Sequence, residues 1–180
     1  VTTCVSGQSY TGLAQGPHTF NVRSTDGAGN QDATAATRSW TVDTLAPDTT
    51  ITSGPTGPVT TTTATFSFTS TEAGTFECSL DGVAFTVCTT PIVYSGLSQG
   101  PHNFSVQARD ATTNVDPSPA TRAWIVDSIA PETTINTGPA NPTNQSTATF
   151  TFSSTETGST FECSVDGGAF SACVTGATFN

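Results

Sequence analysis

The chain has 180 residues, only 10% of them charged, and a formal net charge of -10. Four basic residues face fourteen acidic ones, which argues against nucleic acid and against an anionic membrane surface as partners, because both are bound through clustered Lys and Arg. No apolar run approaches the roughly 20 residues that span a bilayer, so we expect no membrane insertion in this segment.

An internal repeat organises the chain. The stretch that begins at Cys88 matches the stretch that begins at Cys4 without a gap, at an offset of 84 residues. A second match relates TATFSFTSTEAGTFECSLDG, from Thr63, to TATFTFSSTETGSTFECSVDG, from Thr147. One additional serine, Ser159, interrupts the second match. Such a long ordered match predicts structural units of about 84 residues rather than one continuous domain.

The phase of the repeat divides the chain unequally. If each unit begins near the proline of APDTT or APETT, residues 47–130 form one complete unit, 1–46 the second half of a unit, and 131–180 the first half of another. The first and last eleven residues also resemble each other. We therefore expect an excerpt of a longer covalent array. Head-to-tail assembly, with 131–180 of one copy completing 1–46 of the next, is the alternative, although the two ends would then compete for one strand position.

The complete unit is predicted to be an all-β sandwich. Apolar and polar residues alternate with a period of two, Gly and Pro separate the runs, and Asp81-Gly82 is a hairpin signal. The expected strands are Thr49–Ser53, Thr63–Thr71, Thr75–Leu80, Ala84–Cys88, Ile92–Tyr94, His102–Asp110 and Thr121–Asp127. The expected core is Phe66, Phe68, Phe76, Leu80, Phe85, Leu97, Phe104, Val106, Trp124 and Val126.

Two runs carry a family resemblance. The run YSGLSQGPH, from Tyr94, continues into NFSVQARD and Asn114, and its sister YTGLAQGPH begins at Tyr10. Together with FECSLDG, these runs resemble the tandem bacterial immunoglobulin-like repeats of secreted and surface proteins. The resemblance covers nearly the whole chain. It implies tandem immunoglobulin-like or fibronectin type III-like sandwiches that serve as spacers, stalks or accessory modules.

Five cysteines indicate the compartment. Cys78 and Cys88 are ten residues apart, and Cys163 and Cys173 repeat that spacing in the next unit. We interpret each pair as a disulfide within its own unit, with buried free thiols or a metal site as alternatives. Cys4 has the phase of Cys88, so its partner is expected upstream of the chain. Disulfides persist outside reducing cytosol, which predicts an extracellular or cell-surface location.

No catalytic set is expected. His18 and His102 occupy the same turn of successive repeats, and each of the four repeated glutamates, Glu72, Glu77, Glu156 and Glu162, belongs to a repeated segment. A catalytic base is rarely duplicated in a linear array, and no nucleophile has an evident partner. The chain is therefore predicted not to be an enzyme.

Acidic loops suggest calcium as the one cofactor to consider. Ca²⁺ takes six to eight oxygen ligands, and acids at the unit junctions could share an ion and stiffen the array. The alternative is that these Asp and Asn residues stabilise turns through local hydrogen bonds. The candidate ligands are Asp26, Asn30, Asp32, Asp43, Asp48, Asp110, Asn114, Asp116, Asp127 and Glu132.

Two sequons could carry glycans. Asn103-Phe-Ser and Asn144-Gln-Ser fit the N-glycosylation pattern, and Asn103 is expected to face solvent because Phe104 faces the core.

These observations predict an architectural role. The expected function is an extracellular stalk, spacer or fibre whose partners are neighbouring repeats or further copies of the chain. The alternatives are an adhesion module for carbohydrate or a receptor, and an accessory module of a secreted enzyme. An adhesion module would need exposed aromatic residues. Trp40 and Trp124 share the phase of inward-facing residues and are expected to be buried.

Overall fold

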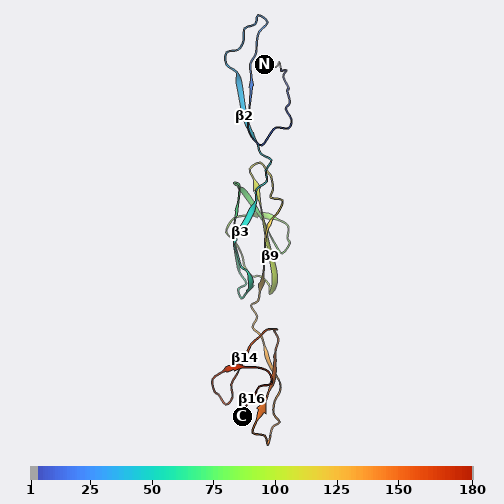
Figure 1. Ribbon diagram of the computed structural model, residues 1–180, viewed down its shortest axis with the longest axis vertical. Coiled ribbons are helices and arrows are strands. Elements are labelled where there is room, and N and C mark those ends of the chain that lie inside the picture. Colours follow the sequence, from blue (N-terminus) through green and yellow to red (C-terminus); the bar gives the residue numbers. More distant parts are fainter. Residues whose placement is uncertain (1–3, 180) are drawn as a thin grey trace. The chain divides into compact units, whose positions relative to one another are not determined.

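The computed structural model describes residues 4–179, and all the regular elements in that part of the chain are β-strands (Figure 1). The chain divides into two compact units, the first ending at Asp127 and the second beginning at Ser128. The all-β prediction is therefore confirmed for the described residues.

Most of the first unit is a body of two sheets built from β3 to β10, residues 49–126. One sheet has the strand order β4-β10-β9-β6-β7, and the other β3-β5-β8. These strands are β3 (Thr49–Ser53), β4 (Gly57–Val59), β5 (Ala64–Ser70), β6 (Gly74–Leu80), β7 (Thr86–Cys88), β8 (Ile92–Tyr94), β9 (Gly100–Asp110) and β10 (Ala120–Val126).

An aromatic cluster joins the two sheets. Phe66 of β5 stacks on Phe104 of β9 with ring centroids 4.1 Å apart, and meets Trp124 of β10 edge-on at 5.2 Å. Phe68 meets Phe76 of β6 at 4.9 Å. Offset and edge-to-face contacts of this kind contribute energy beyond the burial of their area, so this cluster is the centre of the core.

Two expectations for this body need correction. Strand β4 is not among the expected strands; it pairs parallel with β10 at the edge of the sheet, where proline is tolerated. Phe85 was expected in the core but is 37% exposed. Phe85 lies outside β7, which begins one residue later, so the pleat of that strand does not turn its ring inward.

A buried polar contact closes one end of the core. Thr49 is 6% exposed, and its hydroxyl accepts a hydrogen bond from the Ala108 N–H at 2.8 Å. The backbone N–H of Thr49 donates to the Asp116 carboxylate at 2.9 Å. Asp116 is only 2% exposed. Each buried polar group in this contact has a partner, which is the condition under which such groups are tolerated in a core.

The first unit also contains a hairpin that precedes the two-sheet body. Strands β1 (Gly16–Val22) and β2 (Ala36–Val42) pair antiparallel from Gly16↔Val42 to Val22↔Ala36 and form a two-stranded sheet. The register is that of β9 and β10, which pair from Gly100↔Val126 to Val106↔Ala120.

The second unit has three two-stranded sheets, β11-β13, β12-β16 and β14-β15. Their strands are β11 (Thr133–Thr137), β12 (Ala148–Thr149), β13 (Thr151–Ser154), β14 (Phe161–Cys163), β15 (Ser171–Cys173) and β16 (Thr178–Phe179). The pairings repeat those of the first unit: β11 with β13 corresponds to β3 with β5, and β14 with β15 to β6 with β7.

Candidate functional site

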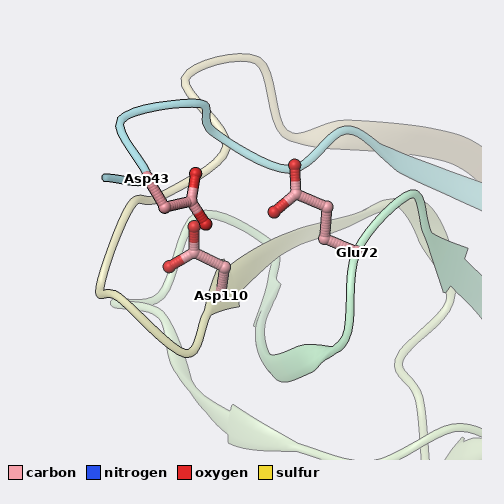
Figure 2. A group of neighbouring side chains, drawn as sticks. All are labelled: Asp43, Glu72 and Asp110. Atoms are coloured by element: carbon pink, nitrogen blue, oxygen red, sulfur yellow. The ribbon is translucent and has the colours of Figure 1, made fainter. Parts of the chain in front are cut away.

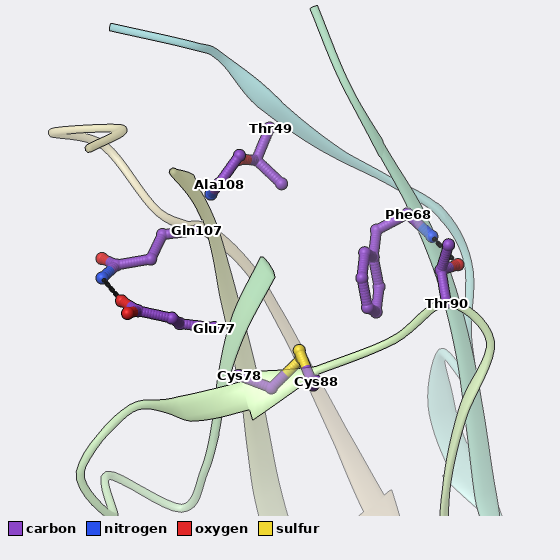
Figure 3. Close-up of a disulfide and its surroundings, with 8 residues drawn as sticks. All are labelled: Thr49, Phe68, Glu77, Cys78, Cys88, Thr90, Gln107 and Ala108. Atoms are coloured by element: carbon purple, nitrogen blue, oxygen red, sulfur yellow. Dashed lines mark hydrogen bonds between the residues drawn. A yellow bond between two sulfur atoms is a disulfide. The ribbon is translucent and has the colours of Figure 1, made fainter. Parts of the chain in front are cut away.

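Each unit contains one disulfide across a hairpin. Cys78 of β6 bonds to Cys88 of β7, beside Phe68 and the Glu77–Gln107 hydrogen bond (Figure 3). Cys163 bonds to Cys173 in the same way. Cys4 is a free, exposed thiol. A buried free thiol or a metal site is thus not the role of the four paired cysteines in this structure.

The predicted calcium ligands in the loops act mainly as turn residues. Asp110 accepts hydrogen bonds from the N–H groups of Thr112 and Asn114 at 2.8 and 2.9 Å, and from the Asn114 amide at 2.8 Å. Burial would raise the pKa of Asp110, but the hydrogen bonds from Asn114 and Thr112 outweigh it, and the pKa lies below its usual value. Asp26 makes the same turn with Asn30, and these bonds lower its pKa.

Four of the other predicted ligands form hydrogen bonds at separate places in the structure. The Asp32 carboxylate accepts from Thr34 within its own turn, and the Asp127 carboxylate accepts from the Gln99 amide at 2.8 Å. Asp48 and Glu132 contribute backbone groups: each N–H donates to a threonine hydroxyl at 2.9 Å, Thr71 for Asp48 and Thr155 for Glu132.

Two predicted ligands do come together with a third acid. Carboxylate oxygens of Asp43, Glu72 and Asp110 lie within 4.8 Å of one another. In Figure 2 the three side chains converge from separate segments: Asp43 follows β2, Glu72 lies in the turn after β5, and Asp110 ends β9. Glu72 was not among the predicted calcium ligands. The sequence feature that could have identified Glu72 is its position in the turn just before β6, at the end of the body where β9 also ends.

The cluster joins the segment after β2 to the sandwich. The Asp43 carboxylate accepts from the Gln15 amide at 2.8 Å, and the Asp43 carbonyl accepts from the Asn114 amide at 3.3 Å. Asp110 is 7% exposed, whereas Asp43 and Glu72 are partly exposed. Carboxylates in such proximity repel one another, and solvent screens this repulsion in part because Asp43 and Glu72 are partly exposed.

The two histidines share a backbone carbonyl contact and a tryptophan stack, and His102 alone also contacts a carboxylate. His102 contacts the Ser98 carbonyl at 2.8 Å and Asp81 at 2.8 Å, and stacks on Trp124 at 5.3 Å. His18 contacts the Ala14 carbonyl at 2.7 Å and stacks on Trp40 at 5.6 Å. The carbonyl of Ser98 and the carboxylate of Asp81 raise the pKa of His102.

The sequons and tryptophans differ in how far they match expectation. Asn103 is exposed while Phe104 is fully buried, as predicted, and Asn144 is exposed. Trp124 is 2% exposed, as predicted, but the prediction for Trp40 is wrong, because Trp40 is 38% exposed. In the described residues no second sheet covers the β1–β2 hairpin, whereas β3, β5 and β8 cover β9 and β10.

An apolar cavity of about 380 Å³ opens in the second unit. Its lining includes Ile135, Phe150, Phe152, Phe161 and Phe170. The corresponding side chains of the first unit form or flank the Phe66 cluster beneath β9 and β10, apart from the partly exposed Phe85. In the first unit β9 and β10 cover these side chains, and among the described residues of the second unit no further strand lies over the cavity.

The comparisons with known proteins found no family model that matches the chain and no curated protein with significant similarity. Among residues 4–179 there is no helix of the length and hydrophobicity needed to cross a membrane.

Proposed function

We propose that the chain is an extracellular architectural segment of immunoglobulin-like repeats, a stalk, spacer or fibre that sets distance rather than performing chemistry. The observation that carries the proposal is the repeated strand pair: β1–β2 and β9–β10 share sequence and register at an offset of 84 residues. A disulfide-linked hairpin also recurs: Cys78–Cys88 links β6 to β7, and Cys163–Cys173 links β14 to β15.

The junction contacts support a restricted linker. Pro47 is fully buried, and its neighbour Asp48 exchanges two hydrogen bonds with Thr71, at 2.9 and 3.0 Å. Glu132 exchanges the same two bonds with Thr155. Proline fixes its own φ and limits the residue before it, so Pro47 and Pro131 reduce the backbone conformations open to the two junction segments. A spacer with stiff linkers transmits length and force along the array.

The two disulfides support the extracytoplasmic location. Disulfides are maintained in oxidising compartments, and small sandwiches exposed to proteases gain stability from them. Thiol titration of protein isolated from its source without reductant should find Cys78, Cys88, Cys163 and Cys173 unreactive. Five reactive thiols in the native protein would contradict an oxidising location.

Small-angle scattering tests the architectural role. A compact single particle of this length would have a radius of gyration of about 16 Å. A stiff series of units is expected to exceed that value clearly when the data are extrapolated to zero concentration. A value near that of a compact particle would overturn the proposal.

Exposed aromatic side chains favour adhesion as the second candidate. Tyr10 is 56% exposed and Trp40 is 38% exposed, and aromatic rings on a surface can stack on sugar faces. Binding to a glycan array that disappears in Trp40→Ala would support this candidate. Equal array signals for the variant and the original chain would remove it.

A further inference from the structure

We propose that protonation of His102 holds the hydrogen bond between Gln99 and Asp127 in place, so that the segment leaving β10 is fastened at acidic pH and released at alkaline pH. His102 is the positioning residue of this latch, which consists of Ser98, Gln99 and Asp127. All four residues belong to the first unit. The inference goes beyond the proposed function, since it adds a pH response to the end of the strand that leads into a junction.

Both ring nitrogens of His102 face hydrogen-bond acceptors. Nδ1 lies 2.8 Å from the Asp81 carboxylate, and Nε2 lies 2.8 Å from the Ser98 carbonyl. Neither a carbonyl nor an ionised carboxylate can donate, so both contacts are hydrogen bonds only when both nitrogens carry a proton. The ring is 6% exposed and stacks on Trp124, whose face favours a cation. The site therefore fits the imidazolium form of His102.

Asp81, in the turn after β6, is the charged group that acts on the ring. A backbone carbonyl and the Asp81 carboxylate raise the pKa of His102 above 6.5, although burial opposes them. From β10 the ring meets the uncharged Trp124, while Arg122 of that strand bonds to the Gly54 carbonyl instead. Strand β4, which pairs with β10, has no titratable side chain. As pH rises through its pKa, His102 loses one proton and its charge.

The loss of one proton removes one of the two hydrogen bonds. The bond to the Asp81 carboxylate is charge-assisted and therefore the stronger, so neutral His102 keeps its proton on Nδ1. The lone pair of Nε2 then faces the Ser98 carbonyl oxygen, which is 2.8 Å away. Two acceptors at that distance repel each other, so the carbonyl turns away from the ring.

This carbonyl is connected directly to the latch. The Ser98 carbonyl and the Gln99 N–H belong to one planar peptide group, so the two must rotate together. Leu97, before this group, is packed in the core, and Gly100, after it, has a φ of 118° that glycine adopts without strain. The rotation is thus confined to residues 98–100, and it moves the Gln99 amide, which now donates to the Asp127 carboxylate at 2.8 Å.

The same connection recurs at the first strand pair. His18 Nε2 lies 2.7 Å from the Ala14 carbonyl, and the next residue, Gln15, donates through its amide to the Asp43 carboxylate at 2.8 Å. Asp43 follows β2 as Asp127 follows β10. The repeat therefore preserves the contacts as well as the residue types, which supports a linked role for the histidine, the loop and the carboxylate.

The test measures the His102 pKa by NMR in the full 180-residue chain, between about pH 5 and pH 9. The signals of the Gln99 side-chain amide and the Asp127 N–H are expected to shift with the midpoint of the His102 ring. Coupling is reciprocal, so loss of the latch must also weaken proton binding. Gln99→Ala should therefore lower the His102 pKa by about 0.5, a roughly threefold loss of proton affinity, although it changes no charge.

Gln107→Ala is the matched control for Gln99→Ala. Gln107 also donates to a carboxylate, that of Glu77 at 2.8 Å, but it lies outside the loop that contacts the ring. Its removal should leave the His102 pKa unchanged.

Asp81→Asn provides an independent test, because the Asp81 side chain is 42% exposed and does not contact the latch. The His102 pKa should fall, and the midpoints of the Gln99 and Asp127 signals should fall with it. The signals of Gln15 should keep their midpoint, because His18 is not bonded to Asp81.

Three results would overturn the proposal: Gln99 and Asp127 signals that do not follow the His102 midpoint, an unchanged His102 pKa in Gln99→Ala, or equal effects of Gln99→Ala and Gln107→Ala. If Gln99→Ala disturbs the fold, its spectrum shows this directly, and the Asp81→Asn titration still decides. The spacer role is judged separately by scattering, since none of these results depends on the length of the particle.

Discussion

At the residue scale, buried hydrogen bonds of Thr49 to Ala108 and Asp116 close one end of the aromatic core. The periodicity identified Phe66, Phe104 and Trp124 as core, because inward-facing aromatic residues are visible in any alternating pattern. It could not identify Thr49, since threonine is common on both faces of these strands. Its burial follows from a contact with Ala108, 59 residues further along the chain, and only the folded structure creates that contact.

Thr49→Val should destabilise the first unit by about 1–3 kcal/mol. Valine has nearly the same shape, but it leaves the buried Ala108 N–H without the acceptor that now lies 2.8 Å away. Urea denaturation of the variant measures the loss. Thr49→Ser keeps the hydroxyl and is the control; equal midpoints for the Val and Ser variants would show that the hydrogen bond contributes nothing.

The His102–Asp81 contact makes part of the stability depend on pH. The pKa of His102 is raised above 6.5 by the Ser98 carbonyl and Asp81, so its contribution is complete below the unfolded pKa and is lost as pH rises through the folded pKa. Burial would raise the pKa of Asp81, but the Asn103 N–H and His102 lower it overall, so that contribution is lost only in acid.

The stability difference between the original chain and His102→Gln should therefore be larger at about pH 5.5 than at about pH 8. Denaturant titrations at both values measure it, and taking the difference cancels groups that titrate equally in both proteins. A difference that stays constant between the two values would exclude His102 as the titrating group.

At the element scale, local signals predicted the hairpins well and the distant pairing poorly. The Asp81-Gly82 turn has positive φ at both residues, 53° and 77°, as a tight two-residue hairpin turn requires. Strands flanked by Gly and Pro were placed within about two residues of their bounds. Strand β4 was missed because its partner β10 is distant in sequence and the pairing is parallel, which no local pattern records.

Removal of the Cys78–Cys88 disulfide tests how far the hairpin stabilises its unit. The bridge closes a ten-residue separation between β6 and β7. The double change of both cysteines to alanine should lower the stability of the first unit by about 2–3 kcal/mol, because the unfolded chain regains the freedom of that loop. Cys4→Ala, at an exposed free thiol, should have no effect on the urea midpoint; equal midpoints for both variants would contradict a stabilising bridge.

At the scale of the whole molecule, each of the two units leaves apolar side chains exposed. Trp40 of the first unit and Ile135 of the second are 38% and 67% exposed, whereas their counterparts in the sequence match, Trp124 and Ile51, belong to the core or pack against it. The carboxylate cluster was only partly predictable. Asp43 and Asp110 were candidate calcium ligands because both recur in the repeat. Glu72 lies beside them because the segment after β2 contacts the sandwich, and sequence spacing alone does not reveal that contact.

Neutralising Glu72 distinguishes repulsion from cation binding at the cluster. In chelator and low salt, Glu72→Gln should stabilise the first unit by up to about 1 kcal/mol, because it removes a like charge within 4.8 Å of Asp43 and Asp110. Sodium chloride should reduce that gain by screening.

Calcium binding at the cluster would give a different result. If Ca²⁺ binds there, as the acidic junctions suggested, millimolar Ca²⁺ should raise the melting temperature of the original chain above that of the variant, whose melting temperature should not change. Glu156→Gln, at the equivalent turn of the second unit, is the control and should show neither effect. A melting temperature unmoved by Ca²⁺ would leave repulsion alone, and calcium would then have no role at this junction.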